Sequence, residues 1–292
     1  MTESEVVEAC LILAQRLGLG TVTPQVIGRF SNLAIALDPL PVVARVATGT
    51  ALLRDTKVFA RREVEIAGFL ARKGASVVAP CEAALAGPHD VSSWTISLWQ
   101  RVEILSEPPD AAEAGRRLAA CHAWLREYSG SVSYFGAFDE LEKLLQHPAV
   151  QDAIAEKDRK LVAQRAQSCR CALEEFFASY QVVHGDSHRK NVFSTREGPL
   201  WADWEDAIFA PVEWDLACLV TEGRILGRDG EWGEAALAAY GNYNAAALEL
   251  CIQARALFAI GWLGLLSSEE ARRQDRRERL AIWLNWVRRR QG

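Results

Sequence analysis

The sequence predicts an α+β chain of two lobes, a small β-rich lobe over residues 1–105 and a larger helical lobe over residues 106–292. Three observations support this division. Short apolar runs bounded by Gly and Pro are concentrated before residue 105, as β-strands require. A Pro108-Pro109 pair then interrupts the pattern. Beyond it, apolar residues recur at steps of three and four, which is the period of an amphipathic helix.

The first lobe combines helices with a hairpin. Its expected elements are a helix over 4–17, turns over 18–20 and 28–32, strands over 33–37 and 42–47, a helix over 57–72 and a strand over 94–105. The segment Asp38-Pro39-Leu40-Pro41 separates the two short strands, so we expect them to pair as a hairpin. Gly74 ends the helix that follows.

The second lobe is expected to be mostly helical. A helix over 110–126 carries the apolar stripe Ala111, Ala114, Leu118, Cys121 and Leu125. Residues 139–179 also fit helices, with an interruption at His147-Pro148, and residues 211–292 are again mostly helical.

Composition narrows the class of protein. Half of the 292 residues are hydrophobic, which is enough for a sizeable core. No apolar run approaches the ~18 residues of a spanning helix, and the N-terminus is acidic, unlike a secretory signal. We therefore expect a cytoplasmic protein with no membrane partner. The net charge of −5 argues against a nucleic-acid partner, and the seven cysteines lack the spacing of a zinc site. The oligomeric state cannot be read from the sequence.

The most informative stretch runs from Val182 to Glu205. Two short apolar strands, 192–194 and 200–202, flank the turn signal Arg196-Glu197-Gly198-Pro199. If they pair, Asn191 and Asp203 come side by side and offer two oxygen ligands for Mg²⁺. Asp186 precedes Asn191 by five residues on a loop, where its carboxylate can orient an attacking hydroxyl.

A second feature lies in the first lobe. Glu63 falls on the apolar stripe of the 57–72 helix, and a carboxylate on a core-facing stripe needs a partner. Arg45 lies on a mostly apolar strand nearby and is the expected partner. The pair either holds a cation over nucleotide phosphates or is a plain structural salt bridge.

These residues resemble the aminoglycoside phosphotransferase and choline kinase superfamily, whose fold is similar to that of protein kinases. The family loop reads His-Gly-Asp, four residues and Asn, as in His184-Gly185-Asp186 and Asn191. The family's metal-binding Asp is matched in Asp203-Trp204-Glu205, and a later Asp-Leu-Ala is matched by Asp215-Leu216-Ala217. The Leu-His-Ala helix of the family is similar to Cys121-His122-Ala123.

The resemblance implies a bilobal protein-kinase-like fold and a Mg²⁺-dependent small-molecule kinase that uses ATP or GTP. The implied catalytic residues are Asp186, Asp215 and His184, and the implied metal ligands are Asn191 and Asp203. The implied nucleotide-binding residues are Arg45, Glu63, Ser31, Asn32, Gln100 and Val102. The chain departs from the family pattern at Gly28-Arg29-Phe30, where the family has a Gly-Gly turn.

The acceptor stays open at this stage. Family members phosphorylate antibiotics, amino alcohols and sugars, so the resemblance allows an antibiotic-resistance role as well as a metabolic one. Trp232 with Glu222, Asp229, Glu231 and Tyr240 would suit an amine-bearing or sugar-like acceptor, or would form a solvated acidic loop.

Two alternatives to a kinase remain. His184, Asp186 and His188 alternate as the metal ligands of a zinc hydrolase do. A non-catalytic nucleotide-binding sensor of the same fold is the other alternative. Against a protein kinase, only twelve residues separate Asp203 from Asp215, which is too few for an activation segment that docks a peptide.

Overall fold

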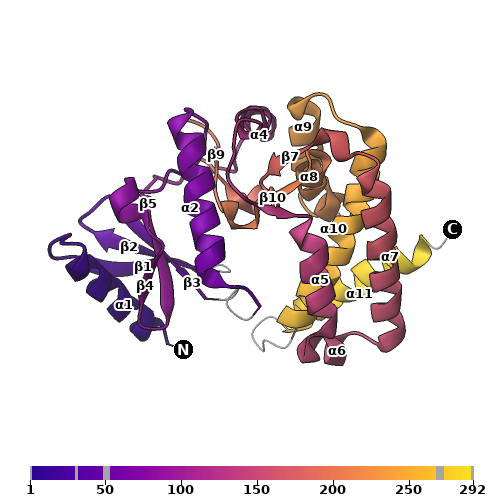
Figure 1. Ribbon diagram of the computed structural model, residues 1–292, viewed down its shortest axis with the longest axis horizontal. Coiled ribbons are helices and arrows are strands. Elements are labelled where there is room, and N and C mark those ends of the chain that lie inside the picture. Colours follow the sequence, from indigo (N-terminus) through magenta and orange to yellow (C-terminus); the bar gives the residue numbers. More distant parts are fainter. Residues whose placement is uncertain (1, 30–31, 49–52, 268–272, 291–292) are drawn as a thin grey trace. The chain divides into compact units, whose positions relative to one another are not determined.

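The computed structural model describes residues 2–29, 32–48, 53–267 and 273–290 (Figure 1). The chain divides into two compact units. Unit 1 consists of Met1–Asp110 and Asn191–Asp206, and unit 2 consists of Ala111–Lys190 and Ala207–Gly292. Unit 1 is therefore discontinuous in sequence. Its second segment lies far beyond the boundary expected at residue 105, and it carries Asn191 and Asp203.

Unit 1 is built on an antiparallel sheet of five strands in the order β1-β2-β3-β5-β4. The strands are β1 (Thr23–Arg29), β2 (Asn32–Asp38), β3 (Val42–Ala47), β4 (His89–Val91) and β5 (Trp94–Gln100). The hairpin expected from the Asp38–Pro41 turn is present, since β2 pairs with β3 from Asn32 opposite Ala47 to Ala36 opposite Val43.

Two helices lie on opposite faces of this sheet (Figure 1). Helix α1 (Glu3–Arg16), capped by Thr2, packs its buried residues against the face that carries Ala44 and Val46 of β3. Because side chains alternate along a strand, Arg45 points to the other face. That face meets Glu63 of helix α2 (Thr56–Arg72). The alternation of β3 thus separates an apolar core from a polar layer.

A short hairpin completes unit 1. Strands β8 (Val192–Phe193) and β9 (Leu200–Trp201) pair antiparallel, with Val192 opposite Trp201. The hairpin is tied to the rest of the unit because the Val78 amide donates to the Trp201 carbonyl at 2.9 Å. Trp201 itself is fully buried. A single helical turn, α3 (Ala83–Ala86), precedes β4.

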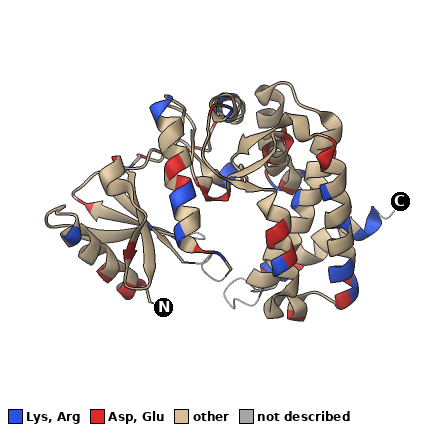
Figure 2. Cartoon of the chain, viewed as in Figure 1, with Lys and Arg blue, Asp and Glu red and all other residues tan. Residues whose placement is uncertain are grey.

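Unit 2 is mostly helical. Its helices are α4 (Ala111–Leu125), α5 (Gly136–Gln146), α6 (Pro148–Ala153), α7 (Glu156–Glu174), α8 (Glu213–Leu226), α9 (Gly230–Tyr240), α10 (Ala245–Leu266) and α11 (Arg273–Arg289). A small sheet in the order β6-β10-β7 joins them, formed by β6 (Ser133–Tyr134), β7 (Tyr180–Val183) and β10 (Ile208–Pro211). Basic residues, Arg288 and Arg289, lie in the last turn of α11 (Figure 2).

Helix α10 is the core helix of unit 2 and contacts α5, α6, α7, α8 and α11. In the described part of the chain, it alone is long and apolar enough by length and composition to cross a membrane. The sequence analysis expected no such run, because Glu249 and Arg255 interrupt the apolar residues. Within the unit 56% of its apolar window is buried, as in the core helix of a globular protein.

The α+β fold class is confirmed, but the sequence analysis missed strands. It assigned Gly28 and Arg29 to a turn, whereas both lie in β1. This edge strand contains Pro24 and Gly28 and alternates only between exposed and half-buried residues, so no apolar alternation marks it. The sheet of unit 2 was missed because β6 spans only two residues and β10 only four. The strand expected over 94–105 ends at Gln100.

Close packing of α4 against α9 generates a first prediction. A Cβ added to Gly115 would lie 2.0 Å from the Ala236 carbonyl oxygen, closer than side chains tolerate. Although Ala is the better helix former, we expect Gly115→Ala to lower the free energy of unfolding by about 1–3 kcal/mol. Urea unfolding measures this change. The exposed helix position Ala120 provides the control, because Ala120→Gly should cost only about 1 kcal/mol from propensity. A Gly115→Ala variant with a higher free energy of unfolding than the parent would contradict the close approach of Gly115 to the Ala236 carbonyl.

Candidate active site

In unit 2 a buried aspartate holds the loop that carries Asp186. Strand β7 ends at Val183 and the chain continues as His184-Gly185-Asp186. Asp215, in the first turn of α8, is fully buried. Its Oδ2 accepts the His184 amide at 2.7 Å and its Oδ1 accepts the Gly185 amide at 2.8 Å. Gly185 adopts a φ of 86°, a conformation that glycine takes without strain. Asp215 therefore fixes the backbone on which Asp186 stands.

The same carboxylate is tied to α4 and α9. His122 Nε2 lies 2.8 Å from Asp215 Oδ2, and His122 Nδ1 lies 2.8 Å from the Tyr240 hydroxyl. In the neutral ring, Nε2 donates to the carboxylate and Nδ1 accepts from the Tyr240 hydroxyl. Tyr240, which the sequence analysis grouped with the acceptor site, is thus bonded to the bracing network.

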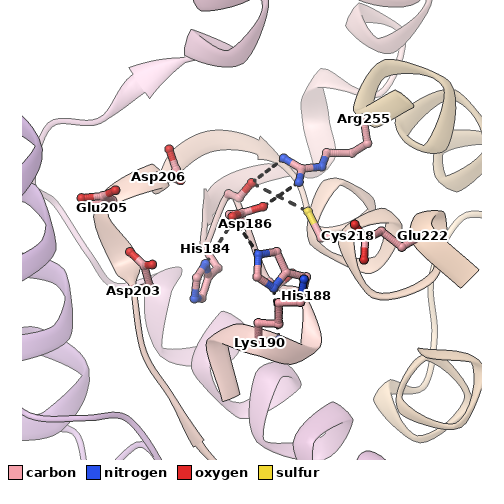
Figure 3. A network of polar contacts seen from close by, with 12 residues as sticks. His184, Asp186, His188, Lys190, Asp203, Glu205, Asp206, Cys218, Glu222 and Arg255 are labelled. Carbon is pink, nitrogen blue, oxygen red and sulfur yellow. Dashed lines mark hydrogen bonds and ion pairs between the residues drawn. The ribbon is translucent and has the colours of Figure 1, made fainter. Parts of the chain in front are cut away.

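The Asp186 carboxylate is partly exposed and lies between Arg255 and the ring of His188 (Figure 3). Arg255 Nη2 donates to Asp186 Oδ1 at 2.6 Å, and His188 Nε2 lies 3.2 Å from Oδ2. Burial raises the pKa of Asp186, but the charges of His188 and Arg255 lower it more, so the net pKa lies well below its ordinary value. Asp186 therefore stays ionised at neutral pH.

His184 is fully buried. Its amide is held by Asp215, and its Nδ1 accepts the Asp186 amide at 3.3 Å. A side chain without exposed surface cannot touch a substrate, so this placement favours a role in ordering the loop.

In unit 1 the hairpin brings Asn191 and Asp203 next to each other, as the sequence analysis expected. The Ala202 amide donates to the Asn191 carbonyl at 2.9 Å, one residue beyond the paired strands. Asn191 and Asp203 therefore stand at the same open end of the hairpin. Asp203 has a φ of 67°, in the left-handed region that Asp tolerates better than most residues.

Arg45 joins this end of the hairpin to α2. It forms the expected ion pair with Glu63, which is 2% exposed. It also lies 2.5 Å from Asp203 and 3.2 Å from Glu205. One guanidinium on β3 thus faces three carboxylates of unit 1.

Further polar contacts hold Glu205. The Asn32 side-chain amide donates to Glu205 Oε2 at 3.1 Å, and Arg54 lies 2.7 Å from the neighbouring Asp206. Burial raises the pKa of Glu205 to about 7, although Arg45 lowers it. Asn32, expected at the nucleotide, is therefore bonded to the segment that carries Asp203.

The remaining expected nucleotide residues are less informative. Ser31 lies outside the described residues. Gln100 is the last residue of β5, and its backbone amide donates to the Ala79 carbonyl at 3.0 Å. Val102 follows in the coil and is half-buried. The nucleotide-binding role of Gln100 and Val102 stays a prediction.

The oxygen donors of Asn191 and Asp203 fit the Mg²⁺ that the fold implies, because hard cations prefer carboxylate and amide oxygens. The Asp203 side chain is 27% exposed and can reach a ligand. Arg45 donates to the same carboxylate from β3.

The zinc alternative does not agree with the geometry around Asp186. Of the three expected ligands, His184 is fully buried and its Nδ1 is engaged by the Asp186 amide. Asp186 Oδ1 already accepts from Arg255 Nη2 at 2.6 Å. Among the described residues no three His, Cys, Asp or Glu side chains form a metal cluster.

The sequence analysis missed Arg255, Trp214, Arg54 and Arg62. Trp214 Nε1 donates to the Gly185 carbonyl at 2.8 Å, and Arg62 Nη1 donates to the Glu205 carbonyl at 3.2 Å. Of these four residues, only Arg255 could have been singled out from the sequence. It lies within an apolar helix, where an arginine needs a buried partner.

Comparisons with known proteins agree with this geometry. A model of the phosphotransferase enzyme family matches residues 28–251. A comparison with curated protein sequences finds no match. The solved structure of amicoumacin kinase hAmiN, in complex with AMP-PNP and Ca²⁺, is similar with a TM-score of 0.71 at 14% identity, covering 100% of this chain and 97% of that one.

Two further solved structures are similar. A microcompartment-associated aminopropanol kinase has a TM-score of 0.71 at 16% identity and covers 95% of this chain and 96% of that one. Choline kinase LicA from Streptococcus pneumoniae has a TM-score of 0.65 at 16% identity, covering 94% of this chain and 98% of that one. At such identities the likeness shows the fold.

The sheet of unit 1, the helical unit 2 and the Asp215-braced loop define the class as a kinase-like phosphotransferase fold. The chain belongs to the phosphotransferase enzyme family, whose model covers most of its length.

The bracing role of Asp215 is testable. Asp215→Asn replaces one acceptor oxygen by an amide that faces an N–H donor, which leaves a buried amide unsatisfied. We expect the free energy of unfolding to fall by about 1–3 kcal/mol. Chemical denaturation measures the change. Asp152→Asn, at an exposed position of α6, is the matched control and should alter stability by less than about 0.5 kcal/mol. Equal stability of the two variants would contradict the role of Asp215.

Proposed function

We propose that this phosphotransferase moves the γ-phosphate of ATP or GTP onto a hydroxyl of a small molecule. One observation carries the proposal. Asp186 presents an ionised carboxylate on a loop whose backbone is locked by the buried Asp215. A fixed carboxylate is what a transferring enzyme needs to orient an attacking hydroxyl.

The low pKa of Asp186 is compatible with this role. In phosphoryl transfer the attacking oxygen forms little bond early in the reaction, so the carboxylate mainly aligns the hydroxyl. Asp186 accepts the hydrogen bond of the acceptor hydroxyl and takes its proton late, as the new P–O bond forms. A strongly basic carboxylate is not required.

Residues of unit 1 are assigned to the nucleotide. Arg45 would contact the upstream phosphates, and its pairing with Glu63 fixes the direction of its guanidinium. Asn191 and Asp203 would hold Mg²⁺, which, when bound, neutralises charge on the phosphate oxygens. Glu205 and Asn32 keep the segment that follows β9 in place.

The acceptor is a hydroxyl compound of antibiotic, amino-alcohol or sugar type. The names of the similar structures support this range, since they are kinases of amicoumacin, aminopropanol and choline. A cationic acceptor would have to compete for the acidic residues of unit 2. Glu222 is paired with Arg279 and Asp229 with Arg189. These pairs weaken the case for a polycationic acceptor.

The proposal is tested by nucleotide turnover with purified protein, ATP or GTP and Mg²⁺ against a panel of hydroxyl acceptors. We expect acceptor-dependent formation of the nucleoside diphosphate and of a phosphorylated product. In Asp186→Asn the rate should fall by at least about 100-fold, because the acceptor hydroxyl loses its orienting carboxylate. Nucleotide affinity, measured by calorimetry, should be retained.

Two results would contradict the proposal. Nucleotide binding without transfer to any acceptor would favour a non-catalytic sensor. Full activity of Asp186→Asn would remove the carboxylate from the reaction. The exposed Asp152→Asn variant is the matched control for the loss of one carboxylate charge in unit 2.

The magnesium assignment gives a separate prediction. Asp203→Asn removes one anionic ligand, so the Mg²⁺ concentration for half-maximal transfer should rise by about 10- to 100-fold. A magnesium titration at saturating nucleotide measures the shift. Asp90→Asn removes an exposed carboxylate that pairs with Lys57 in the same unit, and it should leave the titration unchanged. An unaltered magnesium requirement in Asp203→Asn would refute the assignment.

A further inference from the structure

Helix α10 contributes a nearly buried cation to the loop that carries Asp186. Arg255 is surrounded in sequence by Ala254, Ala256 and Leu257, all of which are buried. Its own side chain is 14% exposed. A guanidinium in such an environment must be compensated by hydrogen bonds or an anion.

The partners of Arg255 belong to the catalytic loop. Nη2 donates to Asp186 Oδ1 at 2.6 Å, and Nη1 donates to the Gly185 carbonyl at 3.3 Å. The two contacts use two arms of one planar fork, which fixes the carboxylate and its backbone together. Figure 3 shows the guanidinium reaching Asp186 beside Cys218.

Aromatic rings hold the guanidinium in this position. Its central carbon lies 5.5 Å from the ring centroid of Trp214 and 5.6 Å from that of Phe258. Trp214 also donates to the Gly185 carbonyl at 2.8 Å, so ring and guanidinium meet at the same carbonyl. Arg255 is therefore packed in place before any substrate arrives.

His188 contacts the carboxylate oxygen of Asp186 that Arg255 does not bind. Nδ1 of His188 accepts the Lys190 amide at 3.2 Å, so in the neutral ring the proton lies on Nε2 and points at Asp186 Oδ2. Arg255 and His188 thus contact different oxygens of the same carboxylate.

We propose that Arg255 is a positioning residue of the phosphoryl transfer, which fixes the rotamer of Asp186 so that its carboxylate receives the acceptor hydroxyl. This inference rests on the proposed function of Asp186. Arg255 itself does not take part in bond making.

The electrostatics of the cluster agree with the geometry. Charged or titratable groups that face Asp186 or its loop come from several elements: His184 and His188 of the loop, Asp215 and Cys218 of α8, and Arg255 of α10. Burial raises the pKa of Asp186, whereas the two histidines and Arg255 lower it. Removing Arg255 should therefore raise the pKa of Asp186, because fewer positive charges then oppose the effect of burial.

Arg255→Met tests the proposal, because it keeps much of the apolar stem and removes the charge. We expect kcat to fall by about 10- to 100-fold with the KM for nucleotide nearly unchanged. The acidic limb of the pH profile of kcat/KM should move upward by about one pH unit. Arg255→Lys restores the positive charge but not the planar guanidinium. It should recover part of kcat and return the acidic limb of the pH profile towards its original pH.

The control is Arg170→Met, which breaks an exposed pair with Asp139 in the same unit and should change neither kcat nor the pH profile. Thermal unfolding of all variants separates loss of folded protein from loss of rate. An Arg255→Met protein that is folded, with the kcat and pH profile of the parent, overturns the proposal. So does a fall in kcat with an unshifted acidic limb, because Arg255 would then not act through Asp186.

A readout independent of activity separates this inference from the proposed function. Arg255 lowers the pKa of His188, so Arg255→Met should raise it. A proton NMR titration of the histidine rings, assigned with His188→Gln, measures that shift. If the parent protein transfers phosphate to no acceptor, the proposed function fails even when the titration shows the expected shift. An unshifted His188 means that Arg255 does not act on the Asp186 pair and overturns the inference.

Discussion

The structure of unit 2 depends on one buried carboxylate. Asp215 accepts the amides of His184 and Gly185 and the ring proton of His122. A buried charge of this kind is tolerated only when its lone pairs are satisfied, and here the donors come from the loop that carries Asp186 and from α4. The loop cannot relax without leaving that charge uncompensated. The position of Asp186 is therefore a consequence of the electrostatics of Asp215.

Local spacing explains why this part of the site could be predicted from the sequence. His184, Gly185 and Asp186 are consecutive, and Asn191 and Asp203 flank a short hairpin whose turn signal is visible. The pairing of Arg45 with Glu63 also followed from local periodicity, since a carboxylate on a core-facing stripe of α2 demands a cation. Each of these inferences needed only local geometry, which was the turn of one hairpin or the side-chain periodicity of a strand and of the helix that follows it.

The rest required the tertiary structure. Arg255 lies 69 residues from Asp186 in the chain, and Arg54 meets Asp206 across an even longer separation. No period or turn signal connects such residues. The missed strands have a different cause, because β1 carries no apolar alternation and β6 is only two residues long. Their backbone pairs with a neighbour that the sequence does not identify.

Both units place an arginine against a carboxylate that is central to the proposed reaction: Arg45 against Asp203, and Arg255 against Asp186. An arginine remains protonated at any physiological pH, so its charge opposes protonation of the carboxylate beside it. Burial alone would have the opposite effect, because a low-dielectric environment favours the neutral acid. In Asp186 the charges of His188 and Arg255 outweigh burial, and the pKa lies below its ordinary value. In Glu205, which also faces Arg45, burial prevails and raises the pKa to about 7. Local motifs supply the residues of the proposed chemistry, and the arginines that oppose burial come from other elements of the fold.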